Sequence, residues 1–486
     1  MMGLGALSLE LAMVGAALAI LLMEFWTTGE DKRRLGLVAA VFVGAIFLGS
    51  FALLFDGRVE AFGGAYVLDE FALYFKRLFL IAALLVLVMA YEFADRFGSG
   101  VGEYYALTLF ALAGMMLAAS AQDFVVLFVA FELMSVCFYV LVSYQRWRVR
   151  SLEAGMKYLV IGALAGAFLV YGIALIYGAA GTLNFRELAA RAGDLTSNRL
   201  LQVGLLLVFV GVGFKIAVVP FQIWVPDVYQ GAPVPTAAFL AVGSKAAGFV
   251  LLIRLLHAGV GALADWWEPA LVVLALLTIL HGALAGIPQK NFRRLMGYSS
   301  IVNAGFLLLA AASPTRDGLV AVLFYLASYL YGVMGAFMVL CLARCPGRED
   351  ETCILAGLHR RSPLLAATLA LSMISLAGLP PAAGFFGKLL VFKALIAGGA
   401  DYPFQPWALR LAVAGAVVAL YFYLNVVRTI YWAPVEEDSA AASRPIHLAP
   451  LTKASVIFSL LVLLWLGLFP GAILNLAEYA VFSLGW

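Results

Sequence analysis

The stretch GVGFKIAVVPFQIWVPD, at residues 211–227, decides the fold because it sets a lysine and two prolines within an apolar run. Lys215 stands five residues before Pro220, and apolar residues continue on both sides. A proline inside a helix removes a backbone donor and frees carbonyl groups, for which lipid offers no partner. The stretch therefore predicts a broken membrane helix whose lysine faces protein or water rather than hydrocarbon.

A second stretch of this kind is SLAGLPPAAGFFGKLLVFK, at residues 375–393, where Lys388 stands seven residues after Pro381. The lysine precedes the proline in one helix and follows it in the other, and we count five spans from one helix to the other. Inverted repeats in transporters leave such a pattern, with a broken helix at the matching position of each half. Two ordinary proline kinks are the alternative, because proline is common in membrane helices.

The composition extends this interpretation to the whole chain. Of 486 residues, 64% are hydrophobic and only 12% are charged. Apolar runs of about 20 residues recur from end to end, and in lipid such runs must be helices. We therefore predict an all-α polytopic membrane protein with about 14 transmembrane helices. The predicted spans are 5–25, 35–55, 70–91, 104–120, 124–144, 156–179, 201–224, 234–257, 268–287, 297–312, 317–343, 364–396, 408–431 and 454–480.

The spans group into four predicted segments. An N-terminal three-helix segment covers residues 1–100. Two inverted five-helix repeats follow at 101–260 and 261–432, each containing a Pro-broken helix. A C-terminal loop and the last helix occupy 433–486.

The orientation follows from the basic residues of the loops. If the loop after the first span is cytoplasmic, that side holds about three times as many Lys and Arg residues as the other. Its clusters include 32–34, 146–150, 290–294 and 360–361. The bias predicts that both termini lie outside the cytoplasm.

Four ionisable residues fall at the middle of predicted spans: Glu132, Lys215, Lys245 and Lys388. A lysine at a helix centre costs roughly 2.5–3.5 kcal/mol on insertion scales, so these side chains need partners or water. Glu132 could pair with Lys215. An ionisable residue in a membrane marks an ion path by default. The alternative is a static ion pair that only fixes helix packing.

Other basic residues within spans lie nearer a helix end. Lys76, Arg77 and Arg254 are expected to extend to the headgroup region, as long basic side chains do. Lys393 could do the same or serve as an exit residue for ions. Polar side chains in helices nine to eleven, among them Asn303 and Tyr325, could link the buried lysines.

Several function classes find no support in the sequence. We find no phosphate-binding loop, no dinucleotide fingerprint, no cysteine framework for an iron–sulfur cluster and no basic tract for nucleic acid. Cys341, Cys345, Cys353 and His359 could hold a metal, but reduced thiols on the cytoplasmic side are the preferred interpretation. We therefore expect no cofactor and no metal site, and energy supplied by a partner or an ion gradient.

Several motifs resemble one known family, the antiporter-like subunits of respiratory complex I, which share a core with Mrp-type sodium/proton antiporters and membrane-bound hydrogenases. The matching stretches are FELMS at 131–135, KIAVVPFQIWVPDVYQGAPVP at 215–235, SKAAG at 244–248, QKNFRRLMGYSSI at 289–301 and GLPPAAGFFGK at 378–388. Together they cover helices five to twelve.

The resemblance implies roles for the buried residues. Glu132 and Lys215 would form the family's charge pair, Lys245 would be the central connecting lysine, and Lys388 the lysine of the second broken helix. Protons would move from cytoplasm to periplasm across the bacterial inner membrane, driven by quinone reduction in partner subunits. Those partners would be the M, K, J and A types and, through them, the NADH-oxidising arm.

Within the family, Lys388 differs from the glutamate of M-type subunits, and the chain lacks the lateral helix of L-type subunits, which favours the N-type branch. Asn303 stands where the family usually has a histidine. Three alternatives remain: a subunit of an Mrp-type antiporter or membrane-bound hydrogenase, a stand-alone transporter of an organic solute, and a structural membrane anchor.

Overall fold

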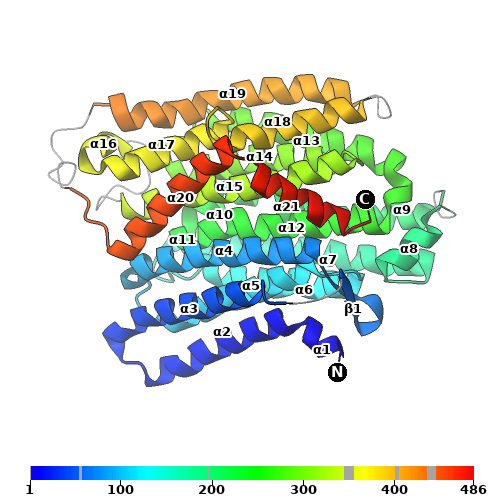
Figure 1. Ribbon diagram of the computed structural model, residues 1–486, viewed down its shortest axis with the longest axis horizontal. Helices are drawn as coiled ribbons and strands as arrows, with labels where there is room; N and C mark the ends of the chain where they lie inside the picture. Colours follow the sequence, from blue (N-terminus) through cyan, green and yellow to red (C-terminus); the bar gives the residue numbers. More distant parts are fainter. Residues whose placement is uncertain are drawn as a thin grey trace.

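The computed structural model describes residues 2–53, 57–193, 197–343, 355–399, 404–434 and 445–485. Its helices run side by side as one bundle, with α2 and α3 along one edge and α19 along the opposite edge (Figure 1). Both termini lie toward the same end of the bundle (Figure 1). An even number of membrane crossings gives this arrangement.

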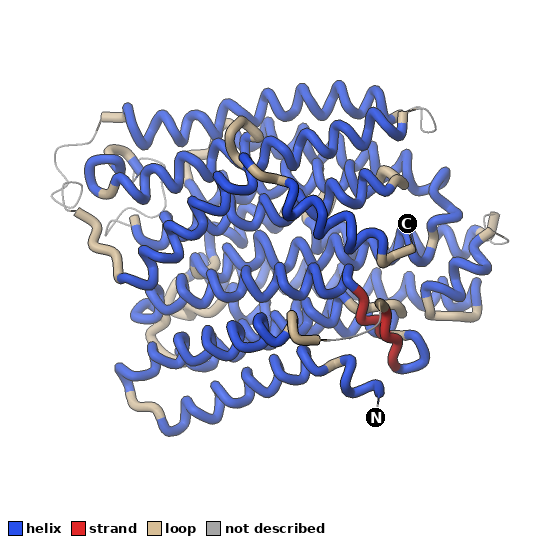
Figure 2. Tube along the Cα trace, in the orientation of Figure 1, coloured by secondary structure: helices blue, strands red, loops and turns tan. Residues whose placement is uncertain are grey.

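The N-terminal segment contains helices and one short hairpin. Its elements are α1 (Met2–Ala6), α2 (Ser8–Trp26), η1 (Gly29–Arg34), α3 (Leu35–Gly49), β1 (Arg58–Ala61), η2 (Phe62–Gly64), β2 (Tyr66–Asp69), α4 (Glu70–Phe93) and η3 (Ala94–Arg96). The two strands pair antiparallel, with Arg58 opposite Asp69. They lie at the end of the bundle where the termini are (Figure 2). The sequence interpretation missed this hairpin, whose strands are only four residues long.

The next segment holds the first broken helix. Its elements are α5 (Val101–Ala119), α6 (Phe124–Val142), α7 (Val149–Ala180), α8 (Phe185–Ala192), α9 (Arg199–Ile216), α10 (Trp224–Gly231), α11 (Val234–Phe239), η4 (Leu240–Ser244), α12 (Lys245–Ile253), η5 (Arg254–Gly259) and η6 (Gly261–Leu263). α11, η4, α12 and η5 form one continuous span, in which η4 and η5 are π-helical turns.

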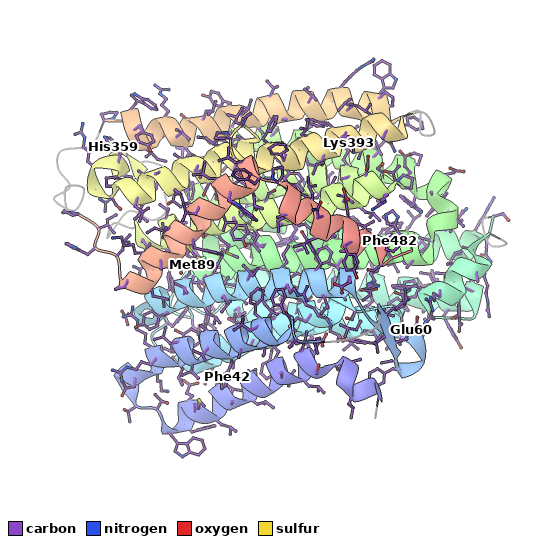
Figure 3. The ribbon with its side chains drawn as sticks, viewed as in Figure 1. Phe42, Glu60, Met89, His359, Lys393 and Phe482 are labelled. Carbon is purple, nitrogen blue, oxygen red and sulfur yellow. The ribbon has the colours of Figure 1, made fainter. Side chains whose placement is uncertain are left out.

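The remaining elements include the second broken helix. They are α13 (Ala264–Gly286), α14 (Phe292–Ala311), α15 (Arg316–Leu342), α16 (Leu358–Arg361), α17 (Pro363–Ala377), α18 (Ala383–Gly398), α19 (Gln405–Trp432), α20 (Pro450–Leu468) and α21 (Gly471–Phe482). The short helix α16, which carries His359, lies at the end of the bundle opposite the termini (Figure 3).

The predicted class, an all-α polytopic membrane protein, is confirmed. Within the described residues, 12 helices are long and apolar enough to cross a membrane. The predicted span at 35–55 corresponds to α3, which has 15 residues. The span at 364–396 divides into α17 and α18, as its prolines predicted.

One predicted span is wrong in detail. The last span, 454–480, is not continuous but ends at Leu468 and resumes at Gly471, so that α20 and α21 meet at an angle (Figure 1). Pro470 has no backbone N–H to continue the ladder of α20. At this corner, a Cβ on Gly467 would collide with the backbone of Pro381, so α20 packs directly on the break between α17 and α18.

The two predicted breaks share one backbone pattern. The residues that cap the carboxyl ends of α9 and α17 are Ala217 (φ 62°) and Gly378 (φ 84°), and both lie in the left-handed region. The next N–H, of Val218 or Leu379, bonds to the carbonyl five residues back, at 3.1 Å in each case. These are Schellman ends, and each is followed at the third position by a cis proline, Pro220 or Pro381. The relation of the two halves as inverted repeats stays a prediction.

Candidate functional site

Lys215 lies in the last turn of α9, immediately before the first break, and only 2% of its surface is exposed. Its amino group donates a hydrogen bond to Ser135 Oγ of α6 at 2.9 Å. The same nitrogen lies 5.0 Å from the centre of the Phe131 ring. An ammonium in this position is stabilised by a hydroxyl and an aromatic face rather than by bulk water.

Glu132 is half-buried on α6, where its carboxylate faces α7. A Cβ on Gly166 would lie 2.7 Å from Glu132 Oε1, so a glycine makes room for this group. No N–O distance within 4.0 Å joins Glu132 to Lys215, so the two side chains are not in direct contact, and their charge pairing stays a prediction. Ser135 instead binds Lys215, and it lies one turn after Glu132 on the same face of α6.

Lys245 begins α12, directly after the π-helical turn η4, in a span that is wholly buried within the protein. Its amino group donates to both the carbonyl and the hydroxyl of Ser300 on α14. Ser300 Oγ also lies 3.0 Å from Tyr229 Oη. π-helical turns within α-helices occur frequently at functional sites because they shift side chains out of the regular register.

Asn303, one turn after Ser299 on α14, connects three helices. Its amide nitrogen donates to the carbonyl of Ser299 at 2.7 Å and to Tyr423 Oη of α19 at 3.1 Å. Its amide oxygen accepts a hydrogen bond from Tyr325 of α15 at 2.7 Å. Ser299 Oγ and Tyr423 Oη lie 2.7 Å apart. Both ends of the Asn303 amide are therefore hydrogen-bonded inside a polar cluster.

Lys388, on α18, reaches back across the second break. Its amino group donates to the carbonyls of Leu376 and Ala377, at 3.0 and 2.7 Å, at the end of α17. A helix carboxyl end carries partial negative charge, which suits a cation. The neighbouring Gly387 packs against the Tyr325 ring, since a Cβ there would lie 2.8 Å from it.

Of the four residues predicted from the sequence, the three lysines on α9, α12 and α18 are buried and Glu132 on α6 is half-buried. Lys215 and Lys245 sit on adjoining helices, because a Cβ on Gly248 would lie 3.4 Å from the Lys215 side chain. We use the term buried polar axis for these four residues and the polar groups between them. Those groups are Ser135, Tyr229, Ser299, Ser300, Asn303, Tyr325 and Tyr423.

The sequence interpretation missed most of the connecting groups. Ser135 could have been found from its spacing to Glu132, and Ser300 from its place in the YSSI motif. Tyr423 gave no signal, because nothing near it in the sequence marks it as different from other tyrosines in spans.

Two further predictions about basic residues are wrong. Lys76 does not reach the headgroups, because it is fully buried and pairs with Glu10 Oε1 of α2 at 2.8 Å. Arg254 is also fully buried and forms a bidentate pair with Asp69 at 2.7 and 2.9 Å. Both partners lie before α4, in the segment where the sequence interpretation found no charge pair. Lys76 and Arg254 can be buried because each one is paired with a carboxylate.

Arg77 and Lys393, for which the headgroup region is also considered in the sequence analysis, are less buried than Lys76 and Arg254. Arg77 is half-buried and donates to the Ser50 carbonyl at 2.9 Å. Lys393 is largely exposed and pairs with Asp317 at 3.0 Å, toward the end of the bundle where the termini lie (Figure 3).

Outside the spans, Asp227 of α10 ties two helices together. It accepts hydrogen bonds from Lys157 at 2.7 Å and from Arg294 at 2.5 Å. Burial raises the pKa of the Asp227 carboxyl, but these two cations outweigh burial and hold the pKa below its ordinary value. The stretches 215–235 and 289–301, which contain Asp227 and Arg294, are therefore in contact.

The described residues contain no group of three or more His, Cys, Asp or Glu side chains placed to hold a metal ion. Cys345 and Cys353 of the conceivable metal site lie outside the described residues. His359 donates a hydrogen bond from Nδ1 to the carbonyl oxygen of Ile430 at 2.8 Å.

The fold and the site together define a class: a multi-pass helical membrane protein with two similarly broken helices and lysines buried beside both breaks. The family model described as NADH:quinone oxidoreductase/Mrp antiporter, TM, matches residues 121–405.

Relatives match over nearly the whole chain. NADH-quinone oxidoreductase subunit N of Desulforamulus reducens is 36% identical over 98% of this chain and 97% of its own length. The subunit N of Moorella thermoacetica is 38% identical over 98% of each chain. The chain therefore belongs to the family of NADH-quinone oxidoreductase subunit N.

Solved structures agree in fold. A chain of respiratory complex I from Thermus thermophilus aligns over 97% of this chain and 99% of its own length, with a TM-score of 0.80 and 33% identity. A chain of the Mrp complex from Dietzia sp. aligns over 99% of this chain and 97% of its own, with a TM-score of 0.85. At 22% identity, the Mrp match shows the fold alone.

Proposed function

We propose that this chain is a proton-translocating membrane subunit of an NADH-quinone oxidoreductase. Protons would move from cytoplasm to periplasm along the buried polar axis, through Glu132, Lys215, Lys245 and Lys388. Quinone reduction in partner subunits would drive the movement, and the chain itself would hold no redox centre. In this proposal both termini are periplasmic and the chain sits in the bacterial inner membrane.

One observation carries the proposal: three lysine amino groups are buried without a carboxylate within ion-pair distance among the described residues. Lys215, Lys245 and Lys388 bind instead to hydroxyl and carbonyl oxygens. Static packing has no need of such ammonium groups, since apolar residues would be more stable there. Lysine releases a proton readily when it is desolvated, whereas arginine stays charged.

Hydrogen-bonded side chains lie between Lys245 and Lys388 and support the proposed path there. Lys245 bonds to Ser300, and the neighbouring Ser299 leads through Tyr423 and Asn303 to Tyr325. Tyr325 packs beside the residue before Lys388. Asn303 carries no exchangeable charge, so protons would pass it through hydroxyl groups or water rather than on the amide.

The partners of this proposal are the membrane subunits that adjoin N-type subunits, of the M, K, J and A types. The identity to subunit N relatives over nearly full length favours this assignment over an Mrp-type antiporter, whose aligned structure is 22% identical to this chain. A stand-alone solute transporter gains no support from the buried axis, because it offers lysines but no evident recognition groups for an organic substrate.

Lys245→Met tests the proposal. In vesicles holding the assembled complex, we expect proton pumping to fall at least tenfold while the complex still assembles. Lys453→Met is the matched control, because Lys453 is exposed at the start of α20, and its pumping should equal that of the wild type. Normal pumping in assembled Lys245→Met would contradict the proposal.

A further inference from the structure

A groove separate from the buried polar axis opens between α3, α4, α15 and α21. Its volume is about 180 Å³, and its walls are mostly apolar. Phe51 and Leu476, which both line the groove, are more than half exposed, at 58% and 51%. In a membrane-spanning bundle, exposed apolar surface of this kind faces lipid. Two charged side chains, Glu70 and Arg77, also line the groove.

Arg77 is placed to bind an anion. Its guanidinium lies 4.2 Å from the centre of the Phe51 ring, which orients it, and donates through Nη2 to the Ser50 carbonyl and through Nε to Ser50 Oγ. Within the described part of the chain, no carboxylate lies within 4.0 Å of it, and no acceptor is bonded to Nη1. A guanidinium beside lipid without a carboxylate in direct contact is costly. It therefore favours an anionic ligand group, and phosphate matches its geometry.

Glu70 supplies the opposite charge on the same helix. It is the first residue of α4 and stands seven residues before Arg77, about 10 Å along the axis and on the same face. None of the described cationic side chains lies within 4.0 Å of its carboxylate. From the helix start inward, the groove thus presents a carboxylate, then a guanidinium, then apolar walls formed by Ile81, Leu330 and Ile473.

We propose that this groove binds a phospholipid whose headgroup carries a primary amine, such as phosphatidylethanolamine. Arg77 binds the phosphate, Glu70 accepts hydrogen bonds from the ammonium group, and the acyl chains lie along the apolar walls. The order of charges along α4 matches the order of charges along such a lipid. A choline headgroup has no N–H to donate to Glu70, and a glycerol headgroup has no cation.

Lipid binding to the purified full chain tests this proposal. Native mass spectrometry would follow titrations with dioleoyl phosphatidylethanolamine, phosphatidylcholine and phosphatidylglycerol. We expect the ethanolamine lipid to bind about tenfold more tightly than either of the others, roughly the effect of one charge-assisted contact. Equal affinity for the three lipids in the wild-type chain would overturn the proposal without any variant.

Variants separate the two charges. Arg77→Gln should weaken binding of all three lipids about tenfold, and Glu70→Gln should remove only the preference for ethanolamine. Arg410→Gln is the matched control, because Arg410 lies over the Trp407 ring at 4.6 Å but outside the groove. A preference for the glycerol lipid that Glu70→Gln leaves unchanged would contradict the amine assignment, and unchanged binding in Arg77→Gln would contradict the site.

Discussion

At the scale of single residues, the interior of this protein is organised by polar groups that each bind several partners. Asn303 uses both ends of its amide to join α14, α15 and α19. Arg254 likewise uses three nitrogens, two for Asp69 and one for the Ala119 carbonyl. Removing either residue leaves its partners buried and unsatisfied, which costs more than the bonds themselves contribute.

Asn303→Leu should therefore destabilise the protein by about 1–3 kcal/mol, because the Tyr325 hydroxyl loses its buried acceptor. Thermal unfolding of the purified chain measures the loss. Asn425→Leu is the matched control, since Asn425 is exposed on α19 and should change the unfolding temperature little. Equal unfolding temperatures for the two variants would contradict the bonding described for Asn303.

Asp69→Asn should be more severe. It leaves the buried guanidinium of Arg254 without its charge partner, and breaking a buried pair typically costs about 3–5 kcal/mol. Asp31→Asn breaks an exposed pair with Arg34, for which about 0–1 kcal/mol is expected. The same unfolding assay compares the two. A loss in Asp69→Asn no larger than in Asp31→Asn would contradict the burial of that pair.

The sequence predicted which charges are buried better than it predicted their partners. Lys215, Lys245 and Lys388 stood out because a mid-span lysine is costly. The sequence interpretation places Lys76 and Arg254 at the headgroups because both residues stand near the end of a predicted helix. Nearness to a helix end does not tell which face of the helix a side chain occupies. Glu10 and Asp69, their partners, come from elements far away in the sequence.

At the scale of elements, close packing at the second break depends on small residues. A Cβ on Gly384 would overlap the carbonyl of Ser375, and one on Gly378 would lie 2.6 Å from the Lys388 side chain. α18 thus packs on α17 backbone to backbone, which brings Lys388 to the carboxyl end of α17. The prolines predicted the break, but not the contacts that hold its two halves together.

Gly384→Ala should separate α18 from α17, because backbone atoms cannot move aside as a flexible side chain can. We expect a large loss of stability or of folded protein in membranes, measured as the yield of monodisperse chain. Gly44→Ala serves as the control, since nothing lies within 4 Å of a Cβ at that position of α3. Wild-type yield and unfolding temperature for Gly384→Ala would contradict the packing described here.

The tie between α7, α10 and α14 should depend on pH. Lys157 and Arg294 hold the pKa of Asp227 below its ordinary value, near 4, despite the opposing effect of burial. The carboxylate therefore stabilises the fold above that ordinary pKa, and the stabilisation is lost as pH falls through the lower folded value. The unfolding temperature of the wild type should exceed that of Asp227→Asn at pH 7, with the difference shrinking below about pH 4. A difference constant from pH 7 to 3 would contradict this tie.

At the scale of the whole molecule, the two broken helices place Lys215 and Lys388 along one buried polar axis. The class, the approximate spans and the two breaks could be predicted, because apolar length and proline position are properties of the local sequence. The break at Pro470 carries the same signal, a proline within an apolar run, but the sequence interpretation treats residues 454–480 as one span. The strands of the hairpin before α4 are too short for a recognisable alternation of polar and apolar residues. The polar contacts of Tyr423 depend on packing between helices that are distant in the sequence.

The most direct test of the central claim is the proton-to-electron ratio of the assembled complex carrying Lys215→Met, with quinone reduction followed in the same vesicles. Methionine is unbranched like lysine and one atom shorter, so it keeps most of the packing beside Ser135 while removing the amino group that carries the proton. The account predicts a lower ratio with assembly preserved. A wild-type ratio in the assembled variant would contradict it and make this chain a structural neighbour of the pumping machinery.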